Sequence, residues 1–256
     1  MAETILTWKP LAIAIAGGIL PSLVWLWFWL KQDREAPEPT GLIALSFFAG
    51  MAIVYFVLPL QKFVVASIIP IMDMVSTISD KFSLLPPVEQ TVRITLWAFI
   101  EEFAKYATVF LIAFKSKFFD EPLDAVIYLI TAALGFAAME NTLYIFKDIA
   151  TGGALEVLSN GNMRFIGATI VHIVSSALVG IAIAFSFYTP KYIKLVAVTV
   201  GIFVASLLHA YFNLSIIESD GTMKTLLVFS QFWGAILGII VLLAIVKRIP
   251  KPNITN

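Results

Sequence analysis

The chain is a succession of long apolar segments separated by short polar ones. Each segment has roughly 20 residues or more, the length that an α-helix needs to cross the hydrocarbon core of a membrane. Apolar and polar residues do not alternate along these segments, which argues against a membrane β-barrel. The pattern predicts a single all-α domain, residues 1–256, built as a polytopic transmembrane helix bundle. We expect about seven spans, at residues 10–30, 41–60, 92–114, 123–146, 162–188, 192–217 and 225–246.

Residues 61–91 fit this pattern less well. The segment is apolar from Val64 to Met74, but it contains Pro70 and Asp73. An aspartate in the middle of a membrane needs a partner, and the sequence shows none for it. An eighth span is one alternative. We expect an interfacial or re-entrant segment instead.

The first apolar segment ends in Trp25, Trp27 and Trp29 and is followed by the charged, proline-containing residues 31–39. Tryptophans at a span end are typical of the membrane interface. A cleaved signal peptide is the alternative for residues 1–30, but the apolar core is longer than such peptides have and no convincing cleavage site precedes Lys31. We therefore expect a retained helix.

Basic residues are divided nine against seven between the two sides of a seven-span bundle. The side with more lysine and arginine tends to face the cytoplasm, which places the C-terminus there. An eighth span would remove the basis for this orientation.

Composition agrees with a membrane protein. The chain is 60% hydrophobic and 13% charged, with 17 basic and 17 acidic residues and a mean hydropathy of +0.93. Soluble domains have about 45–50% apolar and about 25% charged residues. These values exclude a soluble enzyme, a disordered chain and a basic nucleic-acid-binding protein. The absence of cysteine excludes disulfides, a thiol nucleophile and cysteine-bound zinc.

Ionisable residues inside the spans are the main candidates for function, because each costs about 2.5–3.5 kcal/mol near the centre of a membrane. Counted from the span ends, the carboxylates and histidines among them lie about 9–15 Å below the outer surface. Four helices thus bring polar groups to a similar depth, which predicts one shared site. The residues are Glu101, Glu102, Lys105, Glu140, His172 and His209.

Two histidines and several carboxylates suit a zinc ion with two histidines, one glutamate and an open position for water. Zinc would make that water a stronger nucleophile, while a spare glutamate acts as general base in amide hydrolysis. A metal-free alternative uses a glutamate and a histidine to activate water. In that version His209, with Asn213 one turn away on the same helix face, stabilises the oxyanion.

Four motifs occur in order along the chain. They are EExxK at 101–105, FAxxEN at 136–141, a histidine at 172 in a separate span, and HxxxN at 209–213. Together with Pro21 and the loop at 33–39, they resemble the PrsW family of intramembrane peptidases, over residues 20–215. That family is related to the CAAX-processing and bacteriocin-immunity proteases. Relatives of the CAAX type have histidine where this chain has Glu140, so their mechanism cannot be transferred unchanged.

The resemblance implies a metal-dependent protease of a prokaryotic cytoplasmic membrane that cuts a membrane-anchored protein near its extracytoplasmic side. Such cleavage would be the first cut (site-1) of an anti-sigma factor. Glu101 and Glu102 would form the catalytic pair, supported by Lys105 and Asn213. Glu140, His172 and His209 would hold the metal, predicted to be zinc, or the water. Two alternatives stay open: a CAAX-type prenyl-peptide protease, and a proton-coupled transporter, which also uses ionisable residues within the membrane.

Overall fold

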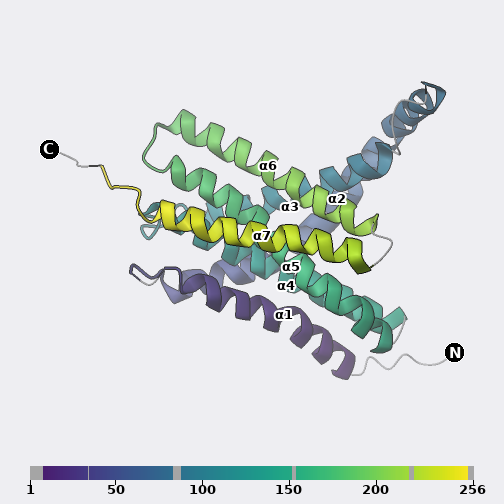
Figure 1. Ribbon diagram of the computed structural model, residues 1–256, viewed down its shortest axis with the longest axis horizontal. Coiled ribbons are helices and arrows are strands. Elements are labelled where there is room, and N and C mark those ends of the chain that lie inside the picture. The colour runs from purple at the N-terminus through teal and green to yellow at the C-terminus, as the bar shows by residue number, and fades with distance from the viewer. Residues whose placement is uncertain (1–7, 34, 83–87, 152–153, 219–221, 253–256) are drawn as a thin grey trace.

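The computed structural model describes residues 8–33, 35–82, 88–151, 154–218 and 222–252. Within these residues the fold is all-helical and the helices pack as a bundle (Figure 1), which confirms the predicted fold class. The helices are α1 (Trp8–Leu30), α2 (Thr40–Phe82), α3 (Val88–Ile112), α4 (Pro122–Thr151), α5 (Ala154–Phe185), α6 (Lys191–Ile217) and α7 (Thr222–Val246).

Every predicted span corresponds to one of these helices. Six segments of the described chain are long and apolar enough to cross a membrane by length and composition. They are Trp8–Leu30, Thr40–Ile68, Pro122–Thr151, Gly167–Phe185, Lys191–Ile217 and Met223–Val246. The helix α3 is not among them because Glu101, Glu102 and Lys105 lie in its middle. It nevertheless packs against α2, α4 and α6 as part of the bundle.

The second helix is longer than the sequence indicates. Residues 61–82 continue α2 as one helix of 43 residues, whose last part projects from the bundle at the upper right of Figure 1. Its apolar part continues to Ile68 without a break in the helix. The side chain of Asp73 and residues 83–87 lie outside the described part of the chain. An interfacial or re-entrant position for residues 61–91 stays a prediction.

The helix α4 runs through the middle of the bundle, packed against α1, α2 and α5. Of its most apolar stretch 94% is buried, against 17% for α1. Small residues allow α2 and α4 to approach closely, since Gly135 lies against the backbone of Phe47 and Gly50 against that of Ala132. Such contacts replace the hydrophobic effect as a source of helix association inside a membrane. They also fix the position of Glu140, which lies further along α4.

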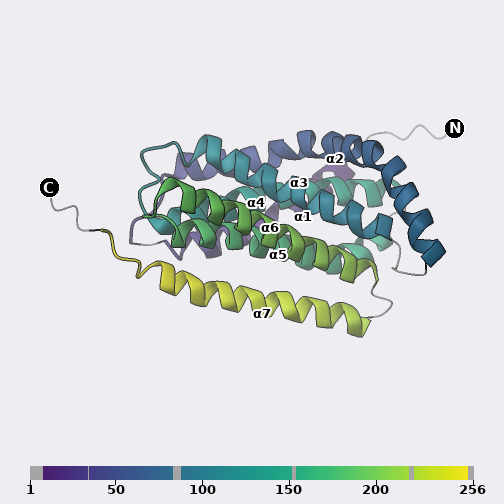
Figure 2. The same ribbon diagram turned by 90° about the horizontal axis from the view of Figure 1, so that it is seen from above.

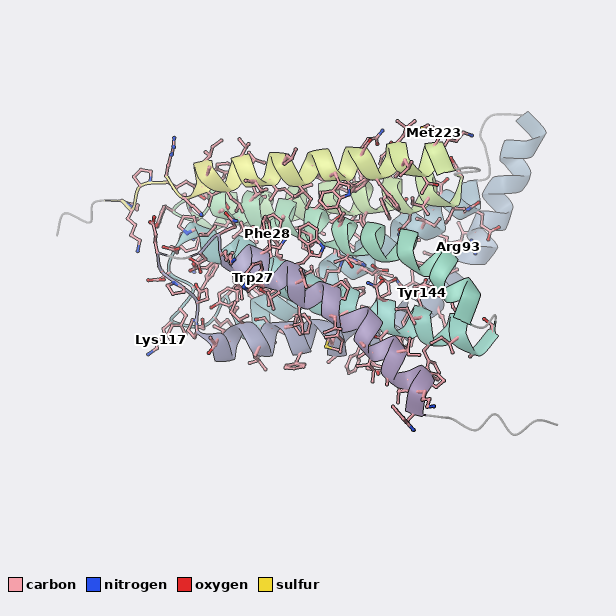
Figure 3. All side chains as sticks on the ribbon, turned by 60° about the horizontal axis from the view of Figure 1, so that its bottom comes forward. Trp27, Phe28, Arg93, Lys117, Tyr144 and Met223 are labelled. Atoms are coloured by element: carbon pink, nitrogen blue, oxygen red, sulfur yellow. The ribbon has the colours of Figure 1, made fainter. Side chains whose placement is uncertain are left out.

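The two ends of the bundle are distinct. The start of α1 and the end of α7 lie at opposite ends, as an odd number of spans requires (Figure 1). Figure 3 shows Lys117 at one end and Arg93 and Met223 towards the other, in line with the division of basic residues into two sets. Figure 2 shows α7 along one face of the bundle, on the far side from α2 and α3. The apolar stretches of α4 and α5 are 94% and 78% buried, so these two helices form the centre of the described bundle.

Candidate functional site

The ionisable residues inside the spans meet in one cluster between four helices. The helix α3 contributes Glu101, Glu102 and Lys105, α4 contributes Glu140, α5 contributes His172 and α6 contributes His209. All except Glu140 are buried, and the Glu140 side chain is 22% exposed. The sequence analysis predicts a similar depth in the membrane for these residues. In the structure they contact one another.

Glu102 is the best-satisfied carboxylate of the cluster. Its Oε1 accepts hydrogen bonds from Lys105 Nζ at 2.7 Å and from His209 Nδ1 at 2.9 Å. Its Oε2 accepts one from the Ser176 hydroxyl at 3.1 Å. Three donors on a buried carboxylate hold it ionised and fixed in place. Both oxygens of Glu102 therefore accept hydrogen bonds from the described residues.

His209 is oriented by Glu102. An ionised carboxylate can only accept hydrogen bonds, so the proton of a neutral His209 ring lies on Nδ1. The lone pair on Nε2 then faces Glu101 Oε2, at 3.7 Å. A histidine held by a carboxylate through one nitrogen, with the other nitrogen available, is the usual arrangement of a metal-binding or water-activating imidazole.

His172 lies between Lys105 and Glu140. Its Nδ1 is 2.8 Å from Lys105 Nζ, and its Nε2 is 2.8 Å from Glu140 Oε2. An ammonium group can only donate, so Nδ1 accepts and Nε2 carries the proton given to Glu140. The His172 and His209 rings meet edge to face, with centroids 4.9 Å apart. The Phe136 ring, 4.8 Å from Lys105 Nζ, adds a cation–π contact to the buried ammonium.

Glu101 is held on one side only. Its Oε1 accepts a hydrogen bond from Gln61 Nε2 at 2.8 Å, while its buried Oε2 has no hydrogen-bond partner among the described residues. The sequence analysis missed Gln61, because the residue directly follows the predicted end of the second span. Only the continuation of α2 past residue 60 places it beside the cluster.

Asn213, also predicted for the site, is half-buried one turn beyond His209. Among the described residues, no hydrogen bond joins it to the cluster. Asn141 donates a hydrogen bond to Thr169 Oγ1 at 3.1 Å and so links α4 to α5. Its role in the structure is that of a connection between helices.

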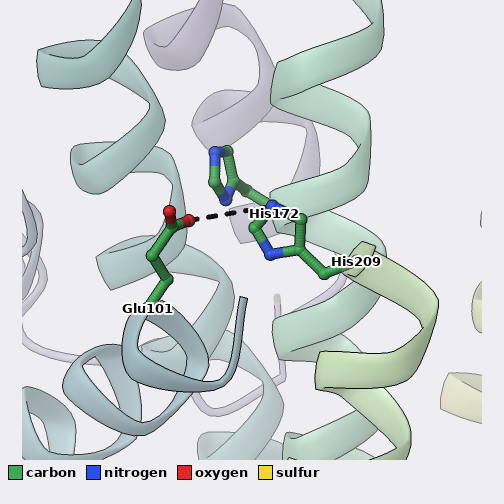
Figure 4. A group of neighbouring side chains, drawn as sticks. All are labelled: Glu101, His172 and His209. Atoms are coloured by element: carbon green, nitrogen blue, oxygen red, sulfur yellow. Dashed lines mark ion pairs between the residues drawn. The ribbon is translucent and has the colours of Figure 1, made fainter. Parts of the chain in front are cut away.

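A metal ion fits a group of three residues that differs from the predicted set. Ligand atoms of Glu101, His172 and His209 all lie within 4.8 Å of one another. Figure 4 shows the carboxylate and the two imidazole rings facing one another. The predicted set has Glu140 in place of Glu101, and that assignment of ligands stays a prediction. Glu140 contacts His172 from α4, on Nε2, whereas Glu101, on α3, has its Oε2 3.7 Å from His209 Nε2.

Comparison with known proteins bears directly on this site. A family model described as PrsW family intramembrane metalloprotease matches residues 38–246, which include every residue of the cluster. The chain belongs to the PrsW family. A Protease PrsW from Geobacillus kaustophilus is 27% identical over 179 residues, which are 70% of this chain and 67% of the relative. A Protease PrsW from Bacillus subtilis is 22% identical over 218 residues, 85% and 89% of the two chains. No solved structure matches the chain.

Membership of the PrsW family makes the chain one of a family of intramembrane proteases, with a protein as substrate. It favours this activity over the CAAX-type protease and over the transporter. The metal, its identity and the role of each residue in the cluster do not follow from the family alone.

Proposed function

We propose that the buried cluster is the catalytic centre of an intramembrane metallopeptidase that hydrolyses a peptide bond in a membrane-anchored protein. One observation carries the proposal. Glu101 Oε2 is buried without a hydrogen-bond partner and faces the available Nε2 of His209. A buried carboxylate oxygen without a hydrogen-bond partner destabilises the fold unless a metal ion or a water molecule binds to it.

The donor set fits zinc. Two imidazole nitrogens and one carboxylate oxygen are the protein ligands of many catalytic zinc sites. Among the described residues of the cluster, three carboxylates face one ammonium group, so a divalent cation would offset a surplus of negative charge. When bound, zinc would acidify a water molecule and polarise the substrate carbonyl. Glu101, His172 and His209 would hold the ion.

Each histidine has one nitrogen held by a carboxylate. Glu102 holds His209 through Nδ1, and Glu140 holds His172 through Nε2. His209 Nε2 and one nitrogen of His172 would be available to hold the ion together with Glu101.

Glu101 has a central role with or without an ion. In the metal-free version it takes the proton of the attacking water, because it is the buried carboxylate with an oxygen that receives no donor. Glu102 cannot take that role without losing its three donors. Asn213 stays a predicted support for the oxyanion.

We further propose that the substrate is membrane-anchored and enters laterally, in a locally unwound form, because a helix hides its peptide carbonyls. Cleavage of an anti-sigma factor near the extracytoplasmic side of a prokaryotic membrane is the specific prediction from the family resemblance.

The test is cleavage of a tagged single-span reporter by the purified protein in proteoliposomes. Glu101→Gln and His209→Ala should each lower kcat by about 10²–10⁴-fold, the usual effect of removing a general base or an activating group. Glu121→Gln, at a carboxylate outside the cluster, is the matched control and should cleave normally. Wild-type turnover by both cluster variants would refute the proposal.

A further inference from the structure

Gln61 is a buried polar residue that the assigned chemistry does not use. It is 6% exposed and lies on α2, whose described side chains add no ionisable group to the cluster. Its Nε2 donates to Glu101 Oε1 at 2.8 Å, and a longer contact of 3.4 Å joins the same nitrogen to the backbone carbonyl of Trp97. A buried amide of this kind in a membrane span requires partners, and both of its partners are on α3.

The orientation of the Gln61 amide follows from its neighbours. A carboxylate and a backbone carbonyl are both acceptors, so the NH2 group and not the oxygen must face them. Trp97 and Glu101 are four residues apart and therefore on one face of α3. The two N–H groups of Gln61 thus join α2 to α3 at the level of the cluster.

This contact determines which oxygen of Glu101 faces the centre. With Oε1 held by Gln61, Oε2 is directed towards His209 Nε2. Without that donor, the Glu101 carboxylate is free to turn about its side-chain torsions. A reacting group displaced by about 1 Å can lose about 10²-fold in rate.

We propose that Gln61 is a positioning residue that holds Glu101 in the orientation needed to complete the centre. The inference rests on the proposed function. Gln61 touches neither the substrate nor the metal in this scheme, and it acts through Glu101. Its loss should therefore lower kcat and the affinity for zinc, and leave KM unchanged.

The test compares Gln61→Met, which has nearly the same shape and no N–H donor, with the wild type. The matched control is Gln231→Met, since Gln231 accepts a hydrogen bond from Tyr211 on an exposed surface away from the cluster. We expect kcat and zinc affinity, measured by chelator competition, to fall about 10–100-fold in Gln61→Met, as for other groups that orient a ligand. Both should be unchanged in Gln231→Met.

A second variant distinguishes the loss of this hydrogen bond from a general folding defect. Gln61→Asn keeps the amide but is one methylene shorter and should lose the contact and show the same two effects. The double variant Gln61→Met/Glu101→Gln should bind zinc no more weakly than Glu101→Gln alone, because the two residues act as one unit. Wild-type kcat and zinc affinity in both folded Gln61 variants would overturn the inference.

Failure of the proposed function gives a different pattern. The wild type and Gln231→Met would then neither cleave the reporter nor bind zinc. In that case the role proposed for Gln61 would also be wrong. If both are active and bind zinc while the Gln61 variants match them, only the role of Gln61 is wrong.

Discussion

His209 and Glu102 are joined by a hydrogen bond of 2.9 Å between Nδ1 and Oε1. This bond determines which nitrogen of His209 carries the proton and leaves Nε2 facing Glu101. Under the proposed function, two glutamates adjacent in the sequence would have different tasks. Glu102 would fix the geometry of the cluster, and Glu101 would offer the oxygen used for chemistry.

The two glutamates should therefore differ in their effect on stability. Glu102→Gln leaves the fully buried Lys105 without its carboxylate and should destabilise the fold by about 3–5 kcal/mol. Glu101→Gln removes a charge whose Oε2 has no partner, and its new amide oxygen still accepts from Gln61. Its Tm in detergent should equal or exceed that of the wild type. Both variants should lose cleavage, and an equal loss of Tm in the two would contradict the division of tasks.

The serine pair on α5 offers a matched comparison. Ser176 donates to Glu102, whereas the buried hydroxyl of Ser175 has no partner among the described residues. Ser176→Ala should cost about 1.5–3 kcal/mol, the range for hydrogen bonds to charged groups. Ser175→Ala should be nearly neutral. Thermal unfolding of the two variants measures the difference, and a larger loss in Ser175→Ala would be inconsistent with these contacts.

A pH dependence of stability is expected from the loop between α1 and α2. Burial, with the Glu121 carboxylate nearby, raises the pKa of Asp33 from 3.8 to about 6. The folded state therefore binds this proton more tightly than the unfolded state. The stability that this provides is present below pH 3.8 and is lost as the pH rises through about 6.

Asp33→Asn keeps an oxygen that can accept the hydrogen bond from the Glu38 backbone N–H and removes the charge. Its Tm should fall less than that of the wild type as the pH rises through that range. Glu35→Gln, at an exposed position in the same loop, serves as the control and should follow the wild-type curve. Parallel curves for wild type and Asp33→Asn would rule out this contribution.

The contact between α2 and α4 should not tolerate added volume. A Cβ at Gly135 would collide with the backbone of Phe47, so Gly135→Ala should cost about 1–3 kcal/mol. A Cβ at Gly238, on α7, meets open space, and Gly238→Ala should stabilise that helix by up to about 1 kcal/mol. Thermal unfolding measures whether Gly135→Ala is less stable, and Gly238→Ala more stable, than the wild type. A neutral Gly135→Ala would show that the two helices are further apart.

The sequence predicts the fold and the clustering of the ionisable residues, for a physical reason. Charges inside apolar spans are costly, so Glu101, Glu102 and Lys105 stand out, and a depth shared with His172 and His209 indicates contact. These signals depend only on position along each helix, which the sequence records directly.

Other features depend on how the helices are rotated and packed. Which carboxylate lies beside both histidines depends on helix packing: Glu101 belongs to the group of three, and Glu140 contacts His172. Gln61 was missed because it directly follows the predicted end of the second span, and only the unbroken continuation of α2 places it beside Glu101. Ser176 contacts Glu102 only once α5 has taken its position against α3.

The proposed catalytic metal centre consists of Glu101, His172 and His209. Its most direct test is the zinc content of the gently purified protein, measured by mass spectrometry beside the His172→Ala/His209→Ala double variant and the Glu121→Gln control. We predict about one zinc per chain in the wild type and the control, as in other catalytic sites with two histidines and a glutamate, and none in the double variant. Zinc absent from the wild type, or equally present in the double variant, would contradict the account.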